Sequence, residues 1–423
     1  MLKRLAYWGL YMVALAALFE AMLAGYFYAT NGQLIYNRDA EAGAVPAALQ
    51  LPGAVFQPYT GYTLREGRTG PYLEQGDWIA TNFGFQNMVA KDKSVCCDYP
   101  YARGENDYVV GIFGGSVGSG FALQAQAGGS FAEALQRVPE ITGKKVVLLN
   151  FSQPGFRQPQ QFTTLAYFLS IGQEFDLVLN IDGFNEVVTS WKNWSDGAEP
   201  SFPADSLWGA WGRQLEQQNV PVAQRGFHLA NYHELSVRAA KDREDSCVIA
   251  LCYYWYKIEG LFHGWRAGAE RASLPETSEQ RSQFPTKIVS EFPDPFDLYA
   301  YTANLWRRSS HGMAELAKIA NARYIHVLQP NQWFEDAGPY TPIKGDHIFE
   351  WVIEPVNKGY RQLRAQSETL TSAGINFLDG SLLFKGVAER TVYVDDCCHY
   401  TPQGYRAIYE AVADNLKEVG PNQ

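Results

Sequence analysis

Short apolar runs alternate with helical stretches along most of the chain. Runs rich in β-branched and aromatic residues occur at 108–113, 145–151, 176–181, 322–328 and, more weakly, 375–378. Between and after them, helical spacing is found at 131–137, 160–171, 302–322 and 402–419. Continuous apolar strands that alternate with helices predict an α/β fold in which a parallel sheet is covered on both faces.

The first thirty residues follow a different pattern. Residues 5–28 are apolar except for Glu20, and a helix of that length, at about 1.5 Å per residue, is long enough to cross a bilayer. Lys3 and Arg4 precede this run, so the positive-inside rule predicts a cytoplasmic N-terminus and an extracytoplasmic main domain. A cleaved signal peptide is the alternative, but no small-x-small cleavage site stands near residues 20–30. We therefore expect a single transmembrane signal anchor that contacts the membrane through residues 5–28.

Glu20 needs an explanation of its own, because a carboxylate inside a bilayer is costly. We expect it to be protonated, to pair with a partner chain, or to lie near enough to the outer face to reach water.

The remaining segments differ in how regular they are. Residues 29–105 look irregular and are read as an extracytoplasmic N-terminal extension, whereas 106–186 and 298–423 carry the strand–helix alternation and form two parts of one domain. Residues 187–297 interrupt the alternation and read as an aromatic-rich insertion, a possible lid or substrate platform. Six tryptophans mark it: Trp191, Trp194, Trp208, Trp211, Trp255 and Trp265.

Composition narrows the possible functions. The chain has 423 residues, 46% of them hydrophobic, and a net charge of −10. This excludes a disordered chain and disfavours a nucleic-acid partner, because binding to phosphates requires a basic surface. Six cysteines fit an oxidising compartment: Cys96, Cys97, Cys247, Cys252, Cys397 and Cys398. Their spacing does not match a zinc pattern, so no metal is expected. Cys247 and Cys252 could close a short loop, and six buried free thiols are the alternative.

Four polar signals stand at the ends of predicted strands or just before the last helix, where ligands of open parallel sheets bind. They are Ser116 in GIFGGSVGSG, Asn150 and Gly155 in NFSQPG, Asn185 in DGFNE, and Asp396 with His399 in DDCCHYTPQG.

These residue types together make acyl transfer possible. A serine hydroxyl needs a general base, which His399 can supply, and Asp396 can orient the imidazole. The backbone N–H groups of Ser116 and Gly155 and the amide of Asn185 could form an oxyanion hole. Each signal alone is common in loops and turns, and it is their order along the chain that indicates a catalytic site.

In this order the motifs resemble those of the SGNH, or GDSL-like, hydrolase superfamily. GGSVGSG, NFSQPG, GFNE and DCCH are similar to its four blocks, which implies Ser116 as nucleophile, Gly155 and Asn185 as oxyanion donors, and Asp396 with His399 as the acid–base pair. The resemblance implies a three-layer α/β/α sandwich around a five-stranded parallel sheet. Gly115 and Glu186 depart from the family's usual aspartates.

The resemblance also implies an activity. Residues 56–87 and 328–330 are similar to membrane-anchored bacterial members linked to cell-envelope polysaccharides. We expect a periplasmic serine esterase or deacylase that uses no cofactor and acts on an acylated carbohydrate or lipid of the envelope. The alternatives are an O-acyltransferase on an exopolysaccharide and a non-catalytic scaffold or assembly subunit with membrane or envelope protein partners.

Three nearby polar residues receive no catalytic role from the sequence. Asp395 stands one position outside the DCCH block and is interpreted as a solvated neighbour, Asp182 as a turn residue, and His326 as a surface or packing residue in a strand.

Overall fold

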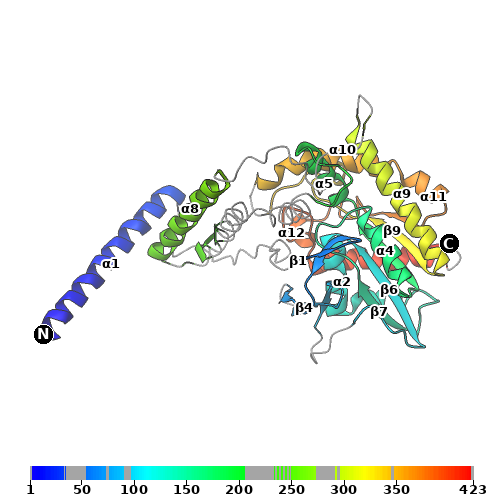
Figure 1. Cartoon of the computed structure of the whole chain (residues 1–423), viewed down its shortest axis with the longest axis horizontal. Helices are drawn as coiled ribbons and strands as arrows, with labels where there is room; N and C mark the ends of the chain where they lie inside the picture. The colour runs from blue at the N-terminus through cyan, green and yellow to red at the C-terminus, as the bar shows by residue number, and fades with distance from the viewer. Residues whose placement is uncertain are drawn as a thin grey trace, which may run out of the picture. The chain divides into compact units, whose positions relative to one another are not determined.

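The computed structural model describes residues 2–32, 34, 54–72, 76–89, 97–204, 291–292, 296–343 and 347–420, and parts of 233–272. The chain divides into two compact units: Met1–Ala47 with Arg213–Gln283, and Ala48–Gly212 with Phe284–Gln423 (Figure 1). Cys96, Trp208 and Trp211 lie outside the described residues.

The larger unit is built on a parallel sheet with the strand order β10-β9-β8-β6-β7. Its strands are β6 (Asp107–Gly114), β7 (Lys145–Asn150), β8 (Leu177–Asp182), β9 (Arg323–Leu328) and β10 (Phe377–Asp379). All residues of β6 and β8 are buried, as expected for inner strands covered on both faces. The prediction of a five-stranded parallel sheet is confirmed.

Two groups of helices pack on this sheet. The first comprises α2 (Ser116–Gly128), α3 (Ser130–Leu135) and α13 (Pro402–Val419), and the second α4 (Gln160–Ser170), α5 (Phe184–Ser195), α9 (Leu298–Ile319) and α10 (Ile353–Arg364). The extensive helix–helix contacts lie within each group, which is the arrangement of a three-layer sandwich. Shorter helices complete the unit: η3 (Glu335–Ala337), η4 (His347–Val352), α11 (Ser367–Ser372) and α12 (Glu389–Val392).

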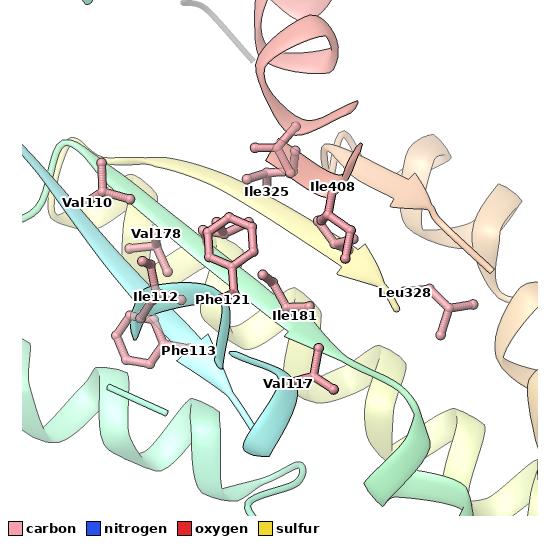
Figure 2. Packing of buried hydrophobic residues seen from close by; sticks show 14 of the residues in the cluster. Val110, Ile112, Phe113, Val117, Phe121, Val178, Ile181, Ile325, Leu328 and Ile408 are labelled. Atoms are coloured by element: carbon pink, nitrogen blue, oxygen red, sulfur yellow. The ribbon is translucent and has the colours of Figure 1, made fainter. Parts of the chain in front are cut away.

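Apolar side chains of strands and helices form one continuous core. Figure 2 shows strand residues such as Val110, Val178 and Ile325 beside Phe121 of α2 and Ile408 of α13. This core fixes the sheet, and the sheet fixes the loops at the carboxyl ends of its strands.

Part of the predicted N-terminal extension folds onto the larger unit instead of forming an irregular arm. It contains a hairpin of β1 (Ala54–Gln57) and β2 (Gly61–Leu64) and an antiparallel sheet of β3 (Thr69–Pro71), β4 (Asp77–Ala80) and β5 (Gln86–Met88). The Tyr62 hydroxyl donates to the Pro154 carbonyl at 2.7 Å, and the Ser119 hydroxyl to the Gln86 side chain at 2.9 Å. Strands of three or four residues are too short to give a clear periodic signal.

The smaller unit contains α1 (Leu2–Asn31) and α8 (Ala250–Ala272). Ala24 and Phe27 of α1 pack with Ala250 and Tyr253 of α8. The Glu20 carboxylate accepts hydrogen bonds from the backbone N–H groups of Ala250 and Leu251, at the positive end of α8. The structure therefore pairs Glu20 within its own chain.

Two sequence expectations have different outcomes in this unit. The Cys247–Cys252 disulfide is present, as the short-loop prediction required. Within the described part of the chain, no helix combines the length and the apolar character needed to span a membrane. The transmembrane prediction for residues 5–28 is therefore not supported.

The predicted insertion is divided between the two units. Its first residues belong to α5, which packs on α9 and α10 in the larger unit, whereas α8 belongs to the smaller one.

The buried strands allow a direct test of the core. Ile325 in β9 is 0% exposed and Ile319 at the end of α9 is 78% exposed. We expect Ile325→Ala to lower the free energy of unfolding by about 2–5 kcal/mol because it leaves a cavity. The matched Ile319→Ala variant should change it by less than about 0.5 kcal/mol. Urea unfolding followed by circular dichroism measures both, and equal losses would contradict this packing.

Candidate active site

Ser116 stands at the junction between the strand β6 and the helix α2. It is the first residue of α2, so the backbone N–H groups around it have no partner within the helix. A Cβ atom on Gly115 would lie 2.2 Å from the Asn185 side-chain nitrogen, and one on Gly114 would lie 2.3 Å from the Ile181 carbonyl oxygen. The two glycines thus let the Ser116 turn approach the end of β8. They also explain why no aspartate precedes the serine in this chain.

His399 reaches Ser116 from the other end of the sequence. Its Nε2 atom lies 2.8 Å from the Ser116 Oγ atom, across 283 residues. The His399 side chain is 21% exposed, so a substrate can approach the pair. The structure therefore joins the predicted nucleophile and the predicted base.

The carboxylate behind His399 is Asp395, not Asp396. The Asp395 Oδ2 atom lies 2.5 Å from His399 Nδ1. Its Oδ1 atom accepts the backbone N–H groups of Cys397, Cys398 and His399 at 3.0, 3.1 and 3.2 Å. One carboxylate therefore folds the turn and faces the imidazole that the turn carries.

Asp396 has a different role, so the prediction that it orients His399 is wrong. Its Oδ1 atom accepts from the Tyr340 hydroxyl and, at 2.6 Å, from the Ile343 backbone N–H. Neighbouring residues of a turn point their side chains in different directions. Asp396 consequently anchors the 340–343 loop, whereas Asp395, which was interpreted as a solvated neighbour, is 8% exposed.

Residues that follow β9 hold the 395–398 turn in place. The side chains of Asn331, Gln332 and Trp333 donate to the carbonyl oxygens of Cys397, Asp395 and Asp396 at 3.3, 3.0 and 2.6 Å. The end of the sheet thus positions the base as well as the nucleophile.

The negative charge of Asp395 favours the protonated form of the His399 imidazole. Burial lowers the pKa of His399, but the Asp395 charge and hydrogen bond outweigh it and raise that pKa to about 9. Burial raises the pKa of Asp395. The charge and hydrogen bond of His399, together with the backbone N–H donors, outweigh burial and lower that pKa to about 2. Asp395 is therefore ionised at neutral pH, as a residue that stabilises an imidazolium must be.

Asn185, the predicted oxyanion donor, lies close to the Ser116 turn through its side-chain nitrogen. It follows Phe184 at the start of α5, and its amide donates to the Phe156 carbonyl at 2.9 Å. Among the described residues this is the hydrogen bond that its amide nitrogen makes, so the second N–H is available to an oxyanion. Gly155, which precedes Phe156, has a φ of 81°, and its turn lies beside the Asn185 amide.

Glu186 ties the two oxyanion segments together, although sequence analysis gave it no role. Its carboxylate accepts the backbone N–H of Gly183 at 2.7 Å and that of Gln158 at 3.0 Å. Burial, together with the nearby Asp182 charge, raises the pKa of Glu186 to about 8. The start of α5 and the loop after β7 are therefore joined by one buried side chain.

A second Ser–His–Asp set lies inside the larger unit. His326 is 2.7 Å from the Ser310 hydroxyl through Nδ1 and 2.8 Å from Asp182 through Nε2. The Trp306 indole donates to Asp182 at 2.6 Å. Ser310 and His326 are 0% exposed, so no substrate reaches them and the set is structural. The sequence does contain a signal for this buried set. His326 stands within an otherwise apolar strand, and a buried imidazole needs a hydrogen-bond partner such as Asp182.

Cys397, Cys398 and His399 are the one group in the described part of the chain whose ligand atoms lie close enough to hold a metal ion. Both ring nitrogens of His399 already face Asp395 and Ser116. Metal binding there would break the pair, so the geometry fits acid–base chemistry better than metal coordination.

Known proteins resemble this chain in structure and not in sequence. No protein-family model matches it, and neither does any curated protein. Solved structures that match include a lipolytic G-D-S-L family protein from Veillonella parvula, with 8% identity, a TM-score of 0.34, and coverage of 73% of this chain and 97% of that one. A catalytic mutant of an acetylxylan esterase from Geobacillus stearothermophilus matches with 11% identity, a TM-score of 0.34 and coverage of 74% and 94%.

An extracellular lipase from Streptomyces rimosus also matches, with 11% identity, a TM-score of 0.33 and coverage of 74% of this chain and 100% of that one. These scores are too low to support an argument about activity. The chain itself shows a five-stranded parallel sheet and a contact between Ser116 and His399. Its four motifs resemble, in their order along the chain, those of the SGNH-like hydrolase superfamily.

Proposed function

We propose that the chain is a serine esterase or deacylase that works through an acyl-enzyme on Ser116. The proposal rests on a chain of two hydrogen bonds. His399 Nε2 lies 2.8 Å from Ser116 Oγ, and His399 Nδ1 lies 2.5 Å from Asp395 Oδ2. A hydroxyl becomes nucleophilic when a positioned base accepts its proton, and the base is stronger when a carboxylate holds it.

Each residue has a defined step in this mechanism. His399 accepts the Ser116 proton as the hydroxyl attacks the ester carbonyl, and then donates it to the leaving alcohol. A water molecule, activated by the same imidazole, releases the acid in the second half. Asp395 stays ionised and stabilises the imidazolium in both halves.

The developing oxyanion has donors from two directions. The Ser116 backbone N–H lies at the free start of α2, and the Asn185 amide lies beside Gly115. The Gly155 N–H is the third donor that the motif order supports. Donors fixed in advance stabilise a transition state without the cost of reorganisation.

We further propose an acylated carbohydrate or lipid of the cell envelope as the substrate, and an extracytoplasmic, membrane-attached location. The resemblance to anchored bacterial members and the Cys247–Cys252 disulfide support the location. Large apolar side chains exposed on α1 support attachment to lipid: Trp8, Leu15, Leu18, Phe19 and Met22.

A short-chain ester tests the activity. We expect the full-length protein to hydrolyse p-nitrophenyl acetate and Ser116→Ala to lower the rate by about 10³-fold or more. Ser310→Ala, which alters the buried set, is the matched control and should stay within a few-fold. An acetylated oligosaccharide formed when an acceptor sugar is added would identify a transferase. Folded protein that neither turns over the ester nor reacts with a fluorophosphonate probe would favour a scaffold.

Two neighbouring aspartates test the corrected assignment. Asp395→Asn should lower the rate of fluorophosphonate labelling by about 10²–10⁴-fold, because the imidazole loses the charge that holds and stabilises it. Asp396→Asn should lower the stability of the 340–343 loop and leave labelling within about tenfold. A larger loss in Asp396→Asn than in Asp395→Asn would reverse the assignment.

The pH dependence follows from His399. The imidazole must be neutral to act as a base, and its pKa is raised to about 9. The labelling rate should therefore rise with pH, about tenfold per unit, and level off above that pKa. Removing the Asp395 charge lowers the pKa of His399, so Asp395→Asn should level off at a lower pH and at a lower rate. A profile that does not change between neutral pH and about pH 10 would contradict this assignment.

A further inference from the structure

Two adjacent cysteines lie between the residues of the acid–base pair. Cys397 and Cys398 separate Asp395 from His399, and their Sγ atoms are 3.0 Å apart. They are the free cysteines of the described part of the chain, whereas Cys97, Cys247 and Cys252 are disulfide-bonded. The unoxidised pair is therefore found at the site itself.

The two sulfurs also lie close to the imidazole. The Sγ atoms of Cys397 and Cys398 and a ring nitrogen of His399 all lie within 4.8 Å of one another, and Cys398 is 2% exposed. Cys397 is only partly buried, so a reagent can reach one sulfur of the pair. A change in the bonding of these sulfurs would therefore act on His399 and, through it, on Ser116.

We propose that Cys397 and Cys398 form a reversible thiol–disulfide site whose oxidation by a disulfide, either a small molecule or the disulfide form of a thiol oxidoreductase, inactivates the Ser116–His399 pair. The inference rests on the proposed function, since it deepens the description of the same site.

The chemistry balances with a disulfide as the oxidant. The Cys397 thiolate attacks one sulfur of the oxidant, forming a mixed disulfide and releasing one oxidant thiol. The Cys398 thiolate then attacks the Cys397 sulfur, forming the intramolecular bond and releasing the second oxidant thiol. Two electrons pass to the oxidant, and the two thiol protons end on its released sulfurs.

The bond cannot form without moving the turn. A disulfide requires a sulfur–sulfur distance of about 2.05 Å, so the two sulfurs must close from 3.0 Å. Both cysteines donate their backbone N–H groups to Asp395, which also holds His399. Closing the sulfurs therefore changes the turn that orients the imidazole.

The test compares reduced and oxidised full-length protein. The chain is reduced with dithiothreitol or oxidised with oxidised glutathione, the 397–398 bond is mapped by mass spectrometry of peptides, and fluorophosphonate labelling is timed. We expect oxidation to slow labelling by about 10²-fold or more, the size of a lost general-base contribution, and dithiothreitol to restore it.

Two variants assign the effect to these sulfurs. Cys397→Ser should label like the reduced protein and not respond to the oxidant. A Cys247→Ser/Cys252→Ser variant should respond as the unaltered chain does. Failure to find the 397–398 bond, or a Cys397→Ser variant that is still inactivated, would overturn the proposal.

A second readout separates this proposal from the proposed function. The His399 imidazole is titrated by NMR in both redox states, with His399→Gln used to assign its signal. Oxidation should change the pKa of His399 even if the protein proves not to label at all. An unchanged titration together with a mapped 397–398 bond would mean that the thiols do not act on the pair.

Discussion

The Asp395 carboxylate is the group on which the site depends. It accepts three backbone N–H groups with one oxygen and faces the His399 imidazole with the other. The same charge that closes the 395–399 turn therefore sets the orientation and the pKa of the base. Any change in the 395–399 turn therefore also changes the orientation and the pKa of the His399 imidazole.

The two Ser–His–Asp sets of this protein differ in their exposure to solvent. Ser310, His326 and Asp182 reproduce the residue types and hydrogen-bond distances of a relay, yet they lie in the interior, with Trp306 donating to the same carboxylate. Ser116 and His399 lie at the rim of the sheet, where the helix α2 begins and the imidazole is partly exposed. A polar set of this kind stabilises a fold when it is enclosed, and acts on a substrate only when the substrate can reach it.

The sequence predicted the features that are local or strongly periodic. Long buried strands gave the parallel sheet, and the positions of Ser116 and His399 beside strand ends or before the last helix predicted that they would meet. The spacing of residues could not show which of two adjacent aspartates turns toward His399, because that depends on backbone hydrogen bonds within the turn.

Other features were missed because their partners are remote or their elements are short. Glu186 acts through the backbone of Gly183 and Gln158, on two different loops, and no pattern along the chain relates them. The strands between residues 54 and 88 have three or four residues each, which is too short to show the alternation of apolar and polar residues that predicts a strand. Glu20 accepts a hydrogen bond from the backbone of Ala250, 230 positions away, and no pattern along the chain relates the two.

The separation of 283 positions between Ser116 and His399 also has a consequence for biosynthesis. A ribosome makes the nucleophile early and the imidazole near the end of translation, so a nascent or truncated polypeptide that stops before Asp395 carries a serine with no base. The hydroxyl stays unactivated while the chain folds, and His399 reaches it only when the C-terminal segment docks against the sheet.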